Sequence, residues 1–336
     1  MAINDSMTEP ELYSTVTIET LLSSPDNPFV LVTVLTPTFN RSLYLKRLFE
    51  SLQAQDFKGF EWLVVDDGST DETESLVRRL AGEAEFEVRY VRQPNQGKHI
   101  ALNTGVQHAN GQYTAVIDAD DWYEPKALQR LVDEWDMIGD PSSYAEVQAL
   151  CADSTGKLIG DRFPCETRLD SDAFEMAYIH RVKGDKRGMQ RTAVLREFPF
   201  PDEFHGVLVS EAHIWFQIAE KYQTRYINEI LGRAEYLAGG LSDDEYRKAV
   251  ERAGPRMRFF RQVAETRRSL PTKDRARAYA NWARNARLSG VSLRAEAATA
   301  RDPIAFLALA PLGVLMSARD RRRVKTLTQQ EQAATD

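Results

Sequence analysis

Strand-like and helix-like segments alternate along residues 29–137, and this alternation limits the fold more than any other feature of the 336-residue chain. Short apolar, β-branched runs predict strands that are buried on both faces. They lie at 29–36, 61–65, 86–91 and 113–117. Helically spaced apolar residues occupy 41–53, 71–80, 98–108 and 125–137. The order predicts an α/β fold with a mostly parallel sheet and helices on both of its faces.

Polar clusters follow three of the predicted strands, at 36–40, 66–70 and 118–121. In open parallel sheets, ligands bind beyond the carboxyl ends of the strands, so these clusters predict one shared site. A dinucleotide-dependent dehydrogenase is excluded, because the turn after the first strand reads Thr-Pro-Thr-Phe-Asn and lacks the required glycines.

The cluster at 118–121 holds three carboxylates, from Asp118, Asp120 and Asp121. Carboxylates this close repel one another unless a cation joins them. Mg²⁺ and Mn²⁺ prefer oxygen ligands and keep positions open for phosphate, so the pattern favours a divalent metal site. An acidic first turn of the helix at 125–137 is the alternative. The position at a strand end favours the metal.

The cluster at 66–70 begins with Asp66 and Asp67, directly after an apolar strand. A carboxylate at this position can accept hydrogen bonds from a nucleobase or ribose. Gly68 permits a tight turn, and Ser69 or Thr70 can cap the following helix. Capping explains the hydroxyl residues but not the two aspartates.

The segments 33–41, 64–71, 97–105 and 117–121 resemble, in order and spacing, the motifs of family 2 glycosyltransferases. The resemblance is close along 30–137 and looser to about residue 240. It implies a GT-A nucleotide-diphospho-sugar transferase fold with a Rossmann-like sheet. It also implies transfer of a sugar from a nucleotide-diphosphate donor, expected to be a UDP-sugar, to a hydroxyl acceptor with inversion.

The resemblance also implies the roles of individual residues. The implied nucleotide site consists of Thr36, Pro37, Phe39, Asp67, Lys98, Asn103 and Asp118. Asp67 is expected to contact the base. Asp118 and Asp120 match the DxD pair; Asp120 is the expected ligand of Mn²⁺ or Mg²⁺, and Asp121 is close enough to replace it.

The family's general base usually lies at the start of a late helix, where this chain has Glu211. The sequence departs here from the commoner Glu-Asp pair. Glu211 is nevertheless the predicted base, and the alternative is an acidic residue that only favours the helix start. A nucleotidyltransferase, a phosphohydrolase using Asp118 and a non-catalytic nucleotide-sugar-binding module remain the rival functions.

The predicted organisation has three parts. They are an extension at 1–28 with a short helix at 18–22, a catalytic domain at 29–242, and a basic helical region at 243–336. The catalytic domain divides into a nucleotide-binding half, 29–137, and an acceptor half, 138–242. In the acceptor half we expect a strand pair at 144–151 and 157–163. The polar stretch 179–204 is expected to be loop-rich, and its basic segment 183–191 is either an acceptor wall or an exposed loop.

Charge is distributed unevenly along the chain. Residues 245–336 carry 20 Lys and Arg against 9 Asp and Glu, whereas residues 1–244 carry 23 against 41. The apolar segment 304–316 precedes the basic segment 319–325, so 303–325 is predicted either to contact a membrane surface or to pack on the catalytic domain. Aromatic and basic residues are not interleaved there, so no nucleic-acid partner is expected.

Two cysteines, Cys151 and Cys165, and an acidic N-terminus without an apolar run indicate a cytoplasmic protein, with possible attachment to the inner face of the membrane. The Gln-x-x-Arg-Trp signature of processive relatives is absent around Gln217. We therefore expect transfer of single sugars, with a glycan or lipid-linked hydroxyl as the acceptor.

Overall fold

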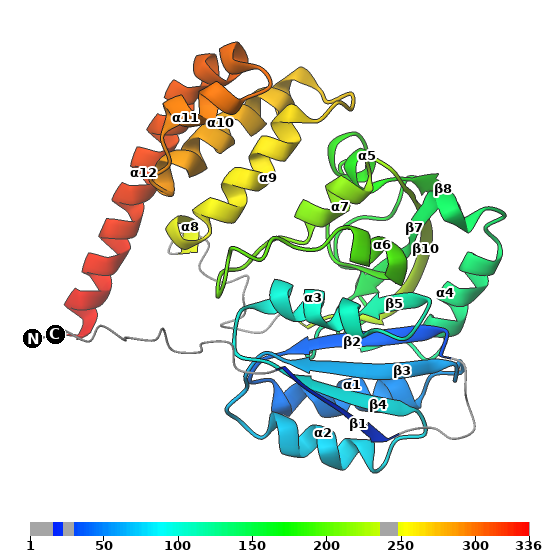
Figure 1. The fold of residues 1–336 in the computed structure, drawn as a ribbon. Coiled ribbons are helices and arrows are strands. Elements are labelled where there is room, and N and C mark those ends of the chain that lie inside the picture. The colour runs from blue at the N-terminus through cyan, green and yellow to red at the C-terminus, as the bar shows by residue number, and fades with distance from the viewer. Residues whose placement is uncertain (1–15, 23–29, 236–247, 336) are drawn as a thin grey trace, which may run out of the picture.

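The computed structural model describes residues 16–22, 30–235 and 248–335, and in these ranges the strands form one mixed ten-stranded sheet (Figure 1). The strand order is β1-β4-β3-β2-β5-β9-β7-β10-β6, and β8 pairs with β10. The strands are β1 (Thr17–Leu22), β2 (Val32–Thr38), β3 (Phe60–Asp66), β4 (Glu87–Arg92), β5 (Tyr113–Val116), β6 (Trp122–Tyr123), β7 (Tyr144–Ala152), β8 (Arg168–Ser171), β9 (Lys186–Arg191) and β10 (Gln223–Arg233).

The described helices follow the alternation predicted for the first half of the chain and dominate its last third. The first seven are α1 (Ser42–Gln53), α2 (Thr73–Ala81), α3 (Lys98–His108), α4 (Ala127–Asp136), α5 (Ala173–Tyr178), α6 (Thr192–Glu197) and α7 (Ala212–Ile218). The C-terminal helices are α8 (Lys248–Glu251), α9 (Ala253–Glu265), α10 (Thr272–Leu288), α11 (Leu293–Thr299) and α12 (Pro303–Thr335). A short 3₁₀ turn covers Pro141–Ser143.

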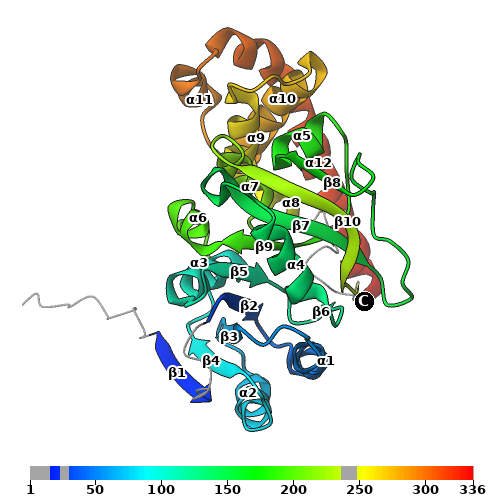
Figure 2. The same cartoon turned by 90° about the vertical axis from the view of Figure 1, so that its right-hand side faces the viewer.

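The predicted α/β fold class is confirmed, with parallel pairing concentrated in β2–β5. Strands β4, β3, β2 and β5 run parallel, while β9 joins β5 and β7 antiparallel. Figure 2 shows α1 and α2 on one face of these strands and α3 on the other. Side chains of β2 alternate between the two faces of the sheet. Val32 and Val34 pack with α1 and α2, whereas Leu35 packs with α3.

Three local predictions were wrong. The segment 18–22 is not a helix but part of β1, which pairs antiparallel with β4. The segment 157–163 contains only an isolated bridge between Leu158 and Ala152. The supposedly loop-rich 179–204 contains β9 and α6, so Lys186–Arg191 is an internal strand and not an exposed loop. That the segment 183–191 forms an acceptor wall stays a prediction.

The C-terminal region is helical, as predicted, and its helices share an apolar core. Trp282 of α10 and Phe306 of α12 are fully buried, and their rings lie 4.3 Å apart. Phe216 of α7 joins this core against Phe259 of α9, with ring centroids 5.6 Å apart. The region therefore packs directly on α7. The proposed boundary at 242/243 lies outside the described residues.

Gly111 gives a test of how β5 is placed beside β2. A Cβ at this position would lie 2.4 Å from the Thr33 nitrogen and 2.7 Å from the Tyr113 carbonyl oxygen, both of them backbone atoms. We expect Gly111→Ala to lower the free energy of unfolding in urea by about 1–3 kcal/mol, because the strands must separate. Gly139→Ala is the control, since nothing lies within 4 Å of its Cβ. Equal stability of the two variants would contradict this account.

Candidate active site

The carboxyl ends of β2 and β3 are joined by hydrogen bonds between two of the predicted polar clusters. Asn40 has a positive φ of 52°, and its Oδ1 accepts a hydrogen bond of 2.8 Å from the Thr70 amide. The Ser69 hydroxyl oxygen in turn accepts one of 2.9 Å from the Asn40 amide. These contacts fix the sheet edge before the third cluster is added.

Asp67 is buried at the end of β3 and organises the connection between β4 and α3. Its two carboxylate oxygens accept hydrogen bonds from Gln93 Nε2 (2.7 Å) and from the amides of Gln96 (2.9 Å) and Gly97 (2.7 Å). Burial raises the pKa of Asp67, and these three donors act against the increase. The carboxylate therefore holds the backbone that leads into Lys98, which starts α3.

The residues expected to line the base pocket differ in exposure. Thr36 and Pro37 are buried, and the Thr36 hydroxyl accepts a 3.1 Å hydrogen bond from Trp62 Nε1. Phe39 is 43% exposed just beyond β2. Of these three, Phe39 is therefore the side chain with surface available for a base.

Asp118, Asp120 and Asp121 come together after β5, and their carboxylate oxygens lie within 4.8 Å of one another. Asp121 is buried and forms an ion pair with Arg187 of β9. Burial raises the pKa of Asp121 to about 7, although Arg187 works against the increase. Desolvation, and then the charge of Asp118, raises the pKa of Asp120.

Lys98 links the acidic cluster to the predicted base. Its Nζ lies 2.7 Å from Asp118 Oδ1 and 3.0 Å from Glu211 Oε1. Desolvation works against an ammonium here, but the two carboxylates raise the pKa of Lys98 overall. The same ammonium lowers the pKa of Asp118 against the effect of desolvation. Residues widely separated in the sequence, in α3, after β5 and before α7, thus meet at one cation.

Two arginines, Arg41 just before α1 and Arg47 within it, also reach the cluster. Arg41 Nε lies 3.9 Å from Asp120 Oδ2, and Arg47 Nη2 donates a 2.6 Å hydrogen bond to the Asp120 carbonyl oxygen. Arg47 also stacks on the Trp122 ring at 3.9 Å and pairs with Glu235. The helical spacing of α1 indicated its buried face but gave no sign of these contacts.

The donor set fits a divalent cation. Three carboxylates offer hard oxygen ligands within a sphere of metal-site size, as Mg²⁺ and Mn²⁺ require. Lys98 already compensates Asp118 and Arg187 compensates Asp121, whereas the Asp120 carboxylate pairs only with Arg41 among the described residues, at 3.9 Å. Asp120 therefore has the carboxylate most in need of a further positive charge.

Residues 33–149 match the family model described as glycosyl transferase family 2. The chain carries a family 2 glycosyltransferase domain. A GalNAc(5)-diNAcBac-PP-undecaprenol beta-1,3-glucosyltransferase of Campylobacter jejuni is 28% identical over 228 residues, which cover 64% of this chain and 70% of that protein. The alignments with the first three curated relatives cover 34%, 70% and 14% of those proteins' own lengths.

Solved structures share the fold of this glycosyltransferase domain and the helices after it. Residues 1–349 of TarS from S. aureus in complex with UDP-GlcNAc superpose with a TM-score of 0.52 at 18% identity, covering 84% of this chain and 90% of that one. A mannosyltransferase from Pyrobaculum calidifontis in complex with GDP-Man and Mn²⁺ gives a TM-score of 0.51 at 20% identity, covering 92% and 90%. At these identities the likeness shows the fold alone.

Asn103 of the glycosyltransferase domain holds a loop and does not join the acidic cluster. Its side chain donates a 2.9 Å hydrogen bond to the Phe200 carbonyl oxygen and accepts one of 2.9 Å from the Phe200 amide. Asn103 and Glu211 also line the same small, mainly apolar pocket, together with Trp215. Asn103 thus shapes the wall beside Glu211.

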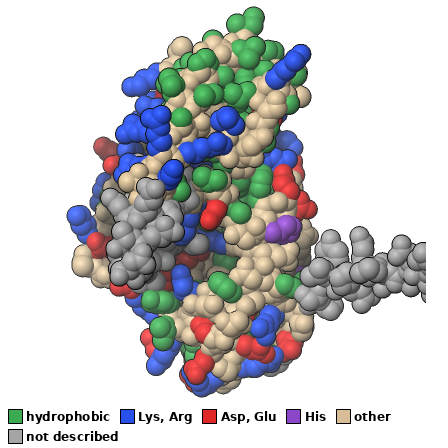
Figure 3. All heavy atoms as spheres, turned by 90° about the vertical axis from the view of Figure 1, so that its left-hand side faces the viewer, with side chains coloured by type: hydrophobic (Ala, Val, Ile, Leu, Met, Phe, Trp, Pro, Cys, Tyr) green, Lys and Arg blue, Asp and Glu red, His purple; other side chains and the backbone are tan. Residues whose placement is uncertain are grey.

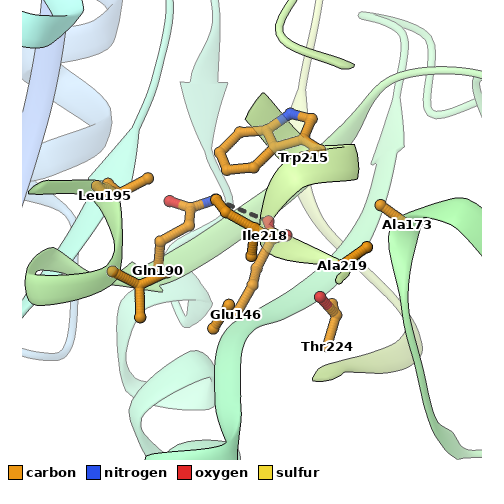
Figure 4. A pocket seen from close by; sticks show the side chains of 10 residues that line it. Glu146, Ala173, Gln190, Leu195, Trp215, Ile218, Ala219 and Thr224 are labelled. Carbon is orange, nitrogen blue, oxygen red and sulfur yellow. Dashed lines mark hydrogen bonds between the residues drawn. The ribbon is translucent and has the colours of Figure 1, made fainter. Parts of the chain in front are cut away.

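A buried carboxylate that the sequence did not single out lies behind α7. Glu146 of β7 accepts hydrogen bonds from Gln190 Nε2 (2.7 Å) and Gln148 Nε2 (3.2 Å). Figure 4 shows Glu146 and Gln190 pointing toward each other beneath Trp215 in a small pocket. Gly188 leaves the necessary space, because a Cβ there would lie 1.9 Å from Glu146 Oε1. Burial raises the pKa of Glu146 to about 7.

The raised pKa makes the stability of the domain depend on pH. The folded state binds the Glu146 proton more tightly than the unfolded state, where the ordinary value is 4.5. This contribution is therefore complete below pH 4.5 and is lost as pH rises through about 7. In the wild type, the free energy of unfolding should fall by up to about 3 kcal/mol as pH rises through this range, and Glu146→Gln should remove this fall. Urea unfolding across the range measures both. Exposed Glu83→Gln is the control; parallel profiles for wild type and Glu146→Gln would rule the idea out.

Proposed function

We propose that this protein transfers single sugars from a UDP-sugar to a hydroxyl acceptor with inversion at the anomeric carbon. The observation that carries the proposal is the Lys98 ammonium between Asp118 and Glu211, at 2.7 and 3.0 Å. This ammonium joins the acidic cluster, where we place the metal and the diphosphate, to the Glu211 carboxylate before α7. The family match to residues 33–149 supports the reaction class, and the family does not favour the nucleotidyltransferase, phosphohydrolase or non-catalytic alternatives.

Each part of the site has a role in the proposed reaction. Phe39 offers a surface for the nucleobase of the donor, while Asp67 keeps the β4–α3 connection in place for the donor. Glu211 accepts the proton of the acceptor hydroxyl as its oxygen attacks the anomeric carbon. Lys98 is placed to bind the departing diphosphate. Asp120, with Asp118, would hold Mn²⁺ or Mg²⁺, which when bound neutralises charge on that diphosphate.

The proposed acceptor is a lipid-linked glycan hydroxyl at the cytoplasmic face of a membrane. The curated Campylobacter relative is named for an undecaprenol-linked substrate, and the TarS structure contains UDP-GlcNAc. These names belong to those proteins and support the proposal by analogy.

Donor and metal binding can be tested without turnover. We expect Mn²⁺ together with a UDP-sugar to raise the melting temperature more than either alone, in a screen that also includes GDP-, CDP- and dTDP-sugars. Asp120→Asn should remove the metal-dependent part of this increase, because it removes the least compensated carboxylate charge. Exposed Asp56→Asn is the control. If no nucleotide raises the melting temperature with any metal, the proposed donor site is wrong.

The role of Glu211 as general base can be tested separately from the donor site. Glu211→Gln preserves the shape of the side chain but cannot accept the proton, so turnover should fall by about 10²–10⁴-fold. Donor binding measured by calorimetry should change little. Glu220→Gln, exposed just beyond the other end of α7, is the matched control. A variant that loses donor binding, or that retains full turnover, would show that Glu211 is not the base.

A further inference from the structure

Helix α12 has an exposed apolar row. Ile304, Leu307, Leu312 and Leu315 are 82%, 54%, 51% and 69% exposed. They are spaced by three to five residues and, together with exposed Ala308 and Pro311, follow one side of the helix. Figure 3 shows hydrophobic side chains gathered on the upper part of the face that includes the C-terminal helices. Exposed apolar patches of this kind indicate contact with a partner or a membrane.

The opposite side of α12 packs on α10. Phe306 is fully buried, and a Cβ on Gly313 would lie 2.4 Å from the Ala280 carbonyl oxygen. Farther along, buried Asp320 pairs with Arg284 at 2.6 Å. Pro303–Thr326 is the one stretch in the described part of the chain that is long and apolar enough to cross a membrane. Because its inner side is packed on a polar helix and includes an ion pair, α12 cannot be surrounded by lipid in this structure.

The apolar row runs into a basic one along the same side. Arg319, Arg322 and Lys325 continue the spacing, are exposed, and form no ion pair with any described residue. Between Pro303 and Thr326 the only acidic residue is Asp320, which Arg284 already compensates. Within Pro303–Thr326, the outward side of α12 thus combines about 16 Å of apolar surface with a cationic end, and the single carboxylate of this stretch is buried against Arg284.

We propose that α12 lies in the plane of a membrane, with its apolar row among the lipid headgroups and its basic end on anionic lipid. A second copy of the chain fits less well. Whether two such helices packed parallel or antiparallel, the arginines of one would meet arginines or apolar side chains of the other and no acidic residue. Anionic lipid compensates each nearby Lys or Arg and accommodates the apolar row at once. This surface does not depend on the transfer reaction.

The C-terminal helices that carry this membrane-facing side of α12 are connected to the candidate active site through the segment 203–206. Glu203 forms an ion pair with Arg258 of α9, and the Gly206 amide donates a 2.8 Å hydrogen bond to the Gln96 carbonyl oxygen before α3. The segment 203–206 thus connects α9, and through α10 also α12, to the backbone just before Lys98.

Flotation of the full chain with vesicles tests the surface. We expect binding to vesicles of phosphatidylcholine with phosphatidylglycerol, and much weaker binding to phosphatidylcholine alone. Arg319→Glu with Arg322→Glu should lower binding to the anionic vesicles by about tenfold or more. Leu312→Ser with Leu315→Ser should weaken binding to both kinds of vesicle. The matched controls are Arg79→Glu on α2 and Leu43→Ser on α1, both exposed in the nucleotide-binding half.

Each outcome is decisive. Binding that is reduced by the α12 variants and retained by the controls supports the proposal, provided that all variants keep the wild-type melting temperature and nucleotide binding. Absence of wild-type binding to anionic vesicles overturns it, as does binding that the α12 variants leave unchanged. A wild-type dimer that Leu312→Ser with Leu315→Ser converts to a monomer would assign the apolar row to a second copy and overturn it as well. None of these results bears on Glu211 or Asp120.

Discussion

Electrostatic repulsion among four carboxylates is the constraint on which the rest of the site depends. Asp118, Asp120, Asp121 and Glu211 share one edge of the sheet, and like charges this close cannot all remain ionised without compensation. The compensating cations come from different elements: Lys98 from α3, Arg187 from β9 and Arg41 from the turn before α1. The acidic site therefore exists only when both halves of the sheet are assembled.

The sequence predicted the nucleotide-binding half well because its signals are local. Apolar runs and helical spacing indicated each of β2 to β5 and α1 to α4 within a few residues, and the predicted helix 98–108 coincides with α3. Since parallel strands place their carboxyl ends at one edge, the clusters at 36–40, 66–70 and 118–121 were expected to share a site. Hydrogen bonds join the first two clusters, and Arg41, the residue after the first cluster, reaches Asp120 of the third.

The acceptor half was harder to predict because its signals are not local. Strand β9 reads Lys-Arg-Gly-Met-Gln-Arg, in which Met189 is the one large apolar side chain, so no apolar alternation indicates a strand. Its buried polar residues find their main partners on distant elements: Asp121 pairs with Arg187, and Glu146 accepts a hydrogen bond from Gln190. Glu146 itself escaped notice because a single glutamate among apolar residues resembles an exposed strand position.

The same dependence on distant partners extends to the C-terminal helices. Phe216 lies five residues after Glu211 and packs on Phe259 of α9, while α9 and α12 both pack on α10. Glu211 is thus positioned by Lys98 on one side and by the C-terminal core on the other. A helix docked in the plane of a membrane would transmit its orientation to Glu211 through packed side chains. A spanning helix would first have to give up its buried contacts with α10, including the Asp320–Arg284 pair, and with them part of the support for Glu211.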